Sequence, residues 1–140
     1  MPMKPRSIGL VIAMIAVVSA VLVVAGQDAS LTRLIPLTAV KSSGVSGTVT
    51  LTDVGGGRTR IEVQVDPAGN LDMPSHIHPG ICGDIIPQPR YPLENVKGGH
   101  TSTVVPASMA ELMTGNLAVT LHKSNEDLKI TTACGTLTAG

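Results

Sequence analysis

The chain has 140 residues with 10 basic and 10 acidic side chains, so its formal net charge is zero. This balance excludes the basic surface that a nucleic-acid partner requires. Phe and Trp are absent and Tyr occurs once, so the core must be built from aliphatic side chains and Met. The length suits a single domain.

A basic N-terminal segment precedes a long apolar run. Lys4 and Arg6 stand before residues 8–25, in which every side chain is apolar or small. This order is typical of an export signal, and the run is also long enough to serve as a membrane-spanning helix. We therefore interpret residues 1–25 as a signal peptide, cleaved after Ala25, or as a membrane anchor. Both alternatives predict a secreted, periplasmic or envelope protein, with the membrane as a partner only if the segment is retained.

The next residues separate this segment from a β-patterned domain. Residues 26–44 have no clear hydrophobic period and are predicted to be a linker, which leaves residues 45–140 as the exported domain. Apolar and polar residues alternate over residues 45–52 and again over residues 58–66. A period of two is the pattern of a half-buried strand, and the glycine-rich turn between the two segments predicts a hairpin.

The middle of the domain is rich in proline. A short strand is predicted at residues 76–78, followed by a long irregular loop over residues 79–95, which hold four prolines. Loops of this length in a compact domain are usually functional or pinned. A further strand is predicted over residues 101–105.

One short helix is predicted near the end of the domain. Ser108 and Glu111 have the spacing of a capping box, which predicts a helix over residues 108–114 with Gly115 just beyond its C-terminus. Two more strands are expected at residues 117–122 and 128–137. The whole pattern predicts an all-β sandwich or barrel of six to eight strands.

Three histidines make a candidate metal site. His76 and His78 lie two residues apart on a strand, so their rings point to the same face and reach one point. His122 points away from the apolar face of its own strand, so its ring is not part of the apolar core pattern. Imidazole is the commonest ligand for copper and zinc, and Cu(II) favours nitrogen ligands. The alternative is that these histidines are structural remnants.

The two cysteines most simply form one disulfide in an exported domain. A bond between Cys82 and Cys134 would close a loop of about 52 residues and contribute roughly 4 kcal/mol to stability. The alternative, a pair of thiol metal ligands, lacks the CxxC spacing that such sites have.

Several segments together resemble one known family. Residues 76–83 read HIHPGICG, residues 121–124 read LHKS and residues 133–135 read ACG. In this order and spacing the chain resembles the copper/zinc superoxide dismutase superfamily, in its small exported bacterial branch, and the related CHRD-type domains. The resemblance covers roughly residues 45–138.

The resemblance implies a fold, a ligand set and a disulfide. It implies a Greek-key β-barrel or sandwich in which His76, His78 and His122 bind copper, with superoxide as the substrate. It also implies a disulfide between Cys82 and Cys134, in agreement with the interpretation from export.

The departures from the family pattern limit the expected activity. The family's bridging and zinc histidines lie in the loop after the HxH pair, where this chain has none, and His100 is not at a ligand position. Thr131 stands where the family has an arginine that guides superoxide, and Glu126 falls at the place of an aspartate that supports the metal ligands. We therefore expect a copper site without zinc and at most weak superoxide dismutation.

Two alternatives use the same fold without catalysis. One is a noncatalytic extracytoplasmic binding or scaffold domain of the CHRD type. The other is a copper-binding protein of the envelope that stores or delivers the metal.

Overall fold

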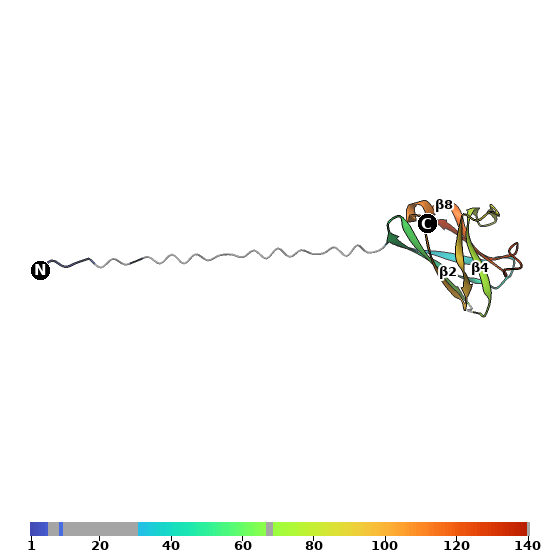
Figure 1. Cartoon of the computed structure of the whole chain (residues 1–140), viewed down its shortest axis with the longest axis horizontal. Helices are drawn as coiled ribbons and strands as arrows, with labels where there is room; N and C mark the ends of the chain where they lie inside the picture. The colour runs from blue at the N-terminus through green and yellow to red at the C-terminus, as the bar shows by residue number, and fades with distance from the viewer. Residues whose placement is uncertain (6–8, 10–30, 67–68, 140) are drawn as a thin grey trace.

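The computed structural model describes residues 1–5, 9, 31–66 and 69–139. The predicted signal peptide or anchor over residues 8–25 therefore lies outside the described residues, apart from Gly9. Within the described ranges, no helix is long and apolar enough to cross a membrane. The domain at the C-terminal side of the chain is built from strands and one short helix (Figure 1).

The elements follow one another with short connections. In chain order they are β1 Thr32–Ala39, β2 Ser46–Gly55, β3 Arg58–Asp66, β4 Asp72–Ile81, β5 Asp84–Ile85, β6 Tyr91–Lys97, β7 His100–Val105, α1 Met109–Leu112, β8 Thr114–His122 and β9 Thr131–Thr138.

Eight of the strands close into an antiparallel barrel. Around the barrel the order is β4-β6-β7-β3-β2-β1-β9-β8, and β8 pairs back onto β4. The two-residue strand β5 adds to β4 as an extra strand. After β4, β6 and β7 the chain returns through α1 to place β8 beside β4, which is a Greek-key connection. The predicted all-β class is confirmed.

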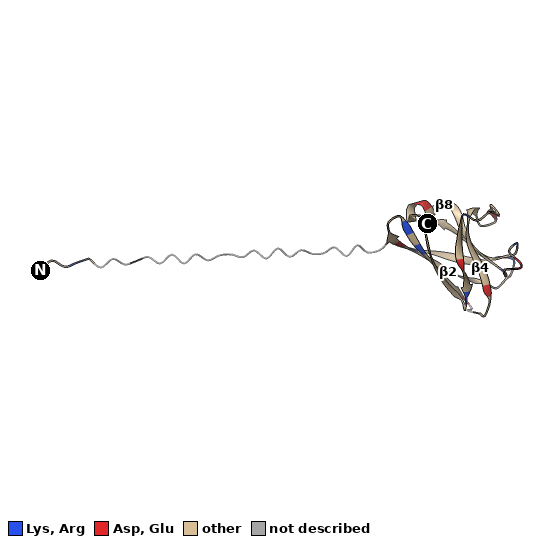
Figure 2. Cartoon of the chain, viewed as in Figure 1, with Lys and Arg blue, Asp and Glu red and all other residues tan. Residues whose placement is uncertain are grey.

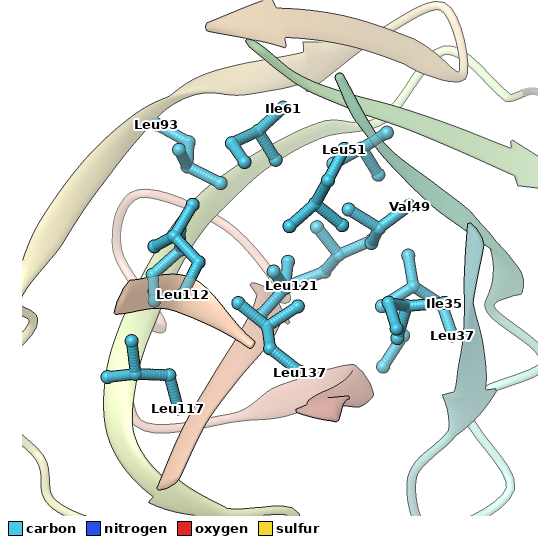
Figure 3. Close-up of a cluster of buried hydrophobic side chains, with 14 of the residues drawn as sticks. Ile35, Leu37, Val49, Leu51, Ile61, Leu93, Leu112, Leu117, Leu121 and Leu137 are labelled. Carbon is cyan, nitrogen blue, oxygen red and sulfur yellow. The ribbon is translucent and has the colours of Figure 1, made fainter. Parts of the chain in front are cut away.

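The inside of the barrel is aliphatic. The predicted hairpin is β2 with β3, in which Val49 pairs with Val63 and Leu51 with Ile61. All four of these side chains are fully buried. Because alternate residues of a strand point to opposite faces, each strand contributes every second side chain to the core. Figure 3 shows the labelled part of this cluster, which comprises Ile35, Leu37, Val49, Leu51, Ile61, Leu93, Leu112, Leu117, Leu121 and Leu137.

The predicted linker is wrong over residues 32–39. This segment is β1, which pairs with β2 and β9 and buries Ile35 and Leu37 in the core. The period of two is hidden in the sequence because the outward residues Leu34 and Pro36 are also apolar. The barrel therefore begins about a dozen residues before the predicted boundary at residue 45.

The predicted long loop over residues 79–95 is also wrong in extent. The strand that carries the histidines continues to Ile81, and β5 and β6 occupy much of the remaining segment. Proline is tolerated where a strand pairs irregularly or on one side only. Pro92 lies in the part of β6 that pairs with β4 alone, because β6 and β7 pair only through Lys97 and His100.

The predicted helix forms but is shorter. The Ser108 hydroxyl accepts from the Glu111 backbone N–H, and the Glu111 carboxylate accepts from the Ser108 N–H at 2.7 Å, so the predicted capping box is confirmed. The helix ends with Met113 as its C-cap, and Gly115 belongs to β8. The predicted strands at residues 101–105 and 117–122 are confirmed within β7 and β8, whereas the last strand begins at residue 131.

Candidate metal centre

The β4–β8 pair puts the three histidines on one face. In its register His76 lies opposite Thr120, and residues directly opposite in an antiparallel pair point to the same side. His78 and His122 each lie two residues from one of these partners and so share that side. The intervening Ile77 is fully buried in the core. The histidines therefore lie on the outer face of the barrel wall.

The three rings converge closely enough to hold an ion. One nitrogen from each ring lies within 4.8 Å of those from the other two, and the ring centroids are 5.0 to 5.6 Å apart. An ion placed at equal distance from the three nitrogens would therefore lie no more than about 2.8 Å from each of them. A zinc–imidazole bond is about 2.0–2.1 Å long. Side-chain shifts of less than about 1 Å would complete the ligand set. In the described part of the chain this is the one cluster of three or more potential ligands.

Each ring has one buried nitrogen without a hydrogen-bond partner. His78 and His122 are 3% and 4% exposed although they face outward, and His76 is half-buried. The buried nitrogens without a partner are His76 Nδ1, His78 Nε2 and His122 Nδ1. Buried polar atoms are nearly always paired, so three such nitrogens in one cluster fit a site that binds a metal ion.

Hydrogen bonds fix the orientation of two rings. His78 Nδ1 lies 2.9 Å from the Ile86 carbonyl oxygen, so Nδ1–H donates and the lone pair is left on Nε2, the nitrogen without a partner. His122 Nε2 lies 3.0 Å from the Thr120 hydroxyl oxygen. Metal-binding histidines are commonly held in this way through their second nitrogen.

Burial lowers the pKa of two of the three rings. Desolvation lowers the pKa of His122 from 6.5 to about 4, and repulsion from His76 and His78 adds to this effect. A hydrogen bond with the Leu128 backbone raises the pKa by a smaller amount. Burial and then the neighbouring His78 lower the pKa of His76. Both rings are neutral at pH 7, the protonation state that a metal requires.

Two of the three rings border a pocket of about 540 Å³. His78 and His122 contribute to one part of its wall. The other lining residues come from the β5 segment, from the connection between β8 and β9 and from the start of β9, and they are Ile85, Pro87, Leu128, Lys129 and Thr131.

The other residues predicted to have a role do not contribute a ring to the cluster. Cys82 and Cys134 are joined in a disulfide with their Cα atoms 5.8 Å apart. His100 is exposed at the start of β7 and does not belong to the cluster. Glu126 is exposed, and in the described residues its carboxylate bonds to none of the three rings. Thr131, at the position of the family's arginine, lines the pocket.

Sequence reasoning missed the residues that support the rings. The alternation of β8 carried a signal for Thr120, because it lies two residues before His122 and on the same face. The sequence gives no signal for the role of the Ile86 carbonyl group, because every residue has a backbone carbonyl. Lys129 and Leu128 lie in the connection between β8 and β9, part of which was predicted to be strand.

No family model matches the chain, and comparison with curated proteins and with solved structures gives no match.

Proposed function

We propose that this protein is an exported copper-binding domain of the superoxide dismutase type, with at most weak superoxide dismutation. The observation that carries the proposal is the convergence of His76, His78 and His122, each with a buried nitrogen that lacks a partner. Their resemblance-based assignment as copper ligands came from the sequence, and their placement on adjoining strands supports it.

The chemistry of the donors favours copper. All three donors are imidazole nitrogens, a set that suits copper, and the affinity order of divalent metals places Cu(II) above Zn(II). The absence of a zinc site remains a prediction. Copper, when bound, supplies one-electron redox chemistry. The protein's own contribution is to hold three nitrogens in place, with Ile86 and Thr120 orienting two of the rings.

The fold and the disulfide support the proposed relationship and location. A Greek-key barrel whose HxH strand is followed by a disulfide to the last strand is the arrangement that the resemblance implied. A disulfide is typical of proteins that work outside the cytoplasm, which agrees with an export signal over residues 1–25.

Weak dismutation follows from the surroundings of the site. Thr131 offers no charge where the resemblance calls for an arginine. Figure 2 shows acidic and basic residues interspersed over the described barrel, and the chain's net charge is zero. Such a distribution gives little long-range attraction for an anion.

Copper titration of alanine variants tests the ligand set. We expect the triple variant H76A/H78A/H122A to lose at least about 100-fold in Cu(II) affinity, a larger loss than removal of a supporting residue causes. His100→Ala is the matched control, because it removes an exposed histidine outside the cluster and should bind copper as the wild type does. Equal affinity in the triple variant would reject the site and leave the noncatalytic scaffold as the better interpretation.

An activity assay separates copper binding from catalysis. We expect the copper-loaded protein to dismute superoxide slowly, yet faster than the same amount of free copper. A rate no higher than that of free copper would reject the enzymatic part of the proposal and leave copper storage or delivery.

A further inference from the structure

The pocket beside the histidines is larger than a copper ion with a small inorganic ligand needs. Its volume of about 540 Å³ falls in the range of small-molecule sites, which is about 300–1,000 Å³. Since His78 and His122 form part of its wall, a molecule in the pocket would lie beside two of the three candidate ligands. Three histidines also leave room at the metal for an outside ligand, as in metal sites with three protein ligands.

Part of the pocket lining is apolar. Ile85 and Pro87 come from β5 and the segment after it, and Leu128 comes from the connection between β8 and β9. Leu128 is 48% exposed, so part of its side chain is open to a ligand in the pocket. Burying this surface under a ligand would be favourable, because apolar area removed from water contributes about 25 cal/mol per Å².

One cation and no acid complete the lining. Lys129 lines the pocket, and neither of the two salt bridges among the described residues involves it. Thr131, which pairs with His122 between β8 and β9, also lines the pocket. A ligand that matches this lining has an anionic end and an apolar body.

We propose that the pocket binds a small apolar carboxylate. The carboxylate group is directed at the three-histidine site and Lys129, and the hydrocarbon part lies against Leu128 and Ile85. This inference rests on the proposed copper site, and it adds a class of ligand to that site.

Competitive titration of the copper-loaded full chain tests the inference. The Cu(II) electron paramagnetic resonance spectrum is followed while hexanoate, acetate or the neutral hexanamide is added. We expect hexanoate to alter the spectrum at a concentration at least about tenfold lower than acetate does, because its four additional methylenes are partly buried. Hexanamide should leave the spectrum unchanged.

Two surface variants separate the contributions of the apolar and the charged lining residues to carboxylate binding. Leu128→Ala should weaken hexanoate binding about fivefold and leave acetate binding unchanged, and Lys129→Met should weaken both. Leu34→Ala and Lys97→Met are the matched controls, because they change an exposed leucine and an exposed lysine that do not line this pocket. Both controls should bind hexanoate as the wild type does.

The possible failures are distinguishable. If no Cu(II) spectrum of the bound ion forms, the proposed copper site is wrong and this inference falls with it. If the copper spectrum is intact but hexanoate binds no better than acetate, or Leu128→Ala has no effect on it, the carboxylate pocket alone is rejected.

Discussion

At the scale of single residues, the metal-free site is a source of pH-dependent instability. His122 has an ordinary pKa of 6.5 when the chain is unfolded and a pKa of about 4 in the folded protein. The unfolded chain therefore binds the proton more tightly, and folding loses stability as the pH falls from about 6.5 to 4. The shift corresponds to at most about 3 kcal/mol, and solvent in the adjoining pocket reduces this to about 1–2 kcal/mol.

Urea unfolding of the metal-free protein at pH 7.5 and near pH 4.5 measures this effect. We expect the free energy of unfolding to fall over this range in the wild type and to fall less in His122→Gln. His100→Ala should behave as the wild type, because its ring is exposed. An unchanged pH slope in His122→Gln would show that other groups cause the loss.

Thr120 is expected to act on the metal through His122. Its hydroxyl lies 3.0 Å from His122 Nε2, and its side chain is fully buried. Thr120→Val keeps the shape of the side chain and removes this partner. Loss of such a supporting group typically costs 10–100-fold in metal affinity, so we expect about tenfold weaker Cu(II) binding by titration.

Thr50→Val is the control for this substitution. Thr50 lies on β2, away from the β4–β8 pair, and the same change there should leave copper binding unaffected. Equal copper affinity in both variants would show that Thr120 has only a packing role.

At the scale of elements, the pairing of β4 with β5 fixes the position of the Ile86 carbonyl group that holds His78. Gly80 has φ +105°, and a Cβ there would collide with the carbonyl oxygen of Asp84 on β5. The residue after β5 is Ile86, whose carbonyl holds His78. Gly80→Ala should therefore displace β5, lower stability by about 2–3 kcal/mol and weaken copper binding about tenfold.

Gly83→Ala, in the turn between β4 and β5, provides the comparison. Gly83 has φ +92°, but a Cβ there would meet open space. We expect backbone strain of about 1–2 kcal/mol in urea unfolding and little change in copper affinity. Copper binding that is equally weak in both variants would argue that strain, not displacement of β5, disturbs the ligand.

The elements that could be predicted are those with a strong local signal. The β2–β3 hairpin followed from clean alternation and a glycine-rich turn, and α1 followed from Ser108 and Glu111. β1 was missed because Leu34 and Pro36 fill its outer face, and β5 because two residues carry no period. Strand ends were misjudged around the prolines, since pairing partners decide whether a proline is tolerated.

At the scale of the whole molecule, the disulfide is a large part of the stability. It joins residues 52 apart, which corresponds to about 4 kcal/mol, whereas domains of this kind have a total of about 5–15 kcal/mol. We expect C82S/C134S to lower the melting temperature by about 10–20 °C. Reductant should lower the wild type to the same value and leave the variant unchanged. A variant that melts as the oxidised wild type does would contradict this expectation.

The candidate site depended on long-range topology that spacing alone does not contain. His76 and His78 were placed together by the period of a strand. Nothing local in the sequence says that β8 lies beside β4, and His122 joined them only through the family resemblance. The pocket, Lys129 and the Ile86 carbonyl required the folded loops.

Under the proposed function, the Greek-key return of β8 to β4 would delay the complete ligand set until the barrel has closed. Before the barrel closes, the chain offers only the neighbouring pair His76 and His78, while His122 is 44 residues away from His78 along the sequence. A copper ion bound by all three histidines would connect β4 to β8 and would stabilise only the closed barrel. At 100 times its dissociation constant it would add about 2.7 kcal/mol. Copper content would then report which exported molecules had completed folding.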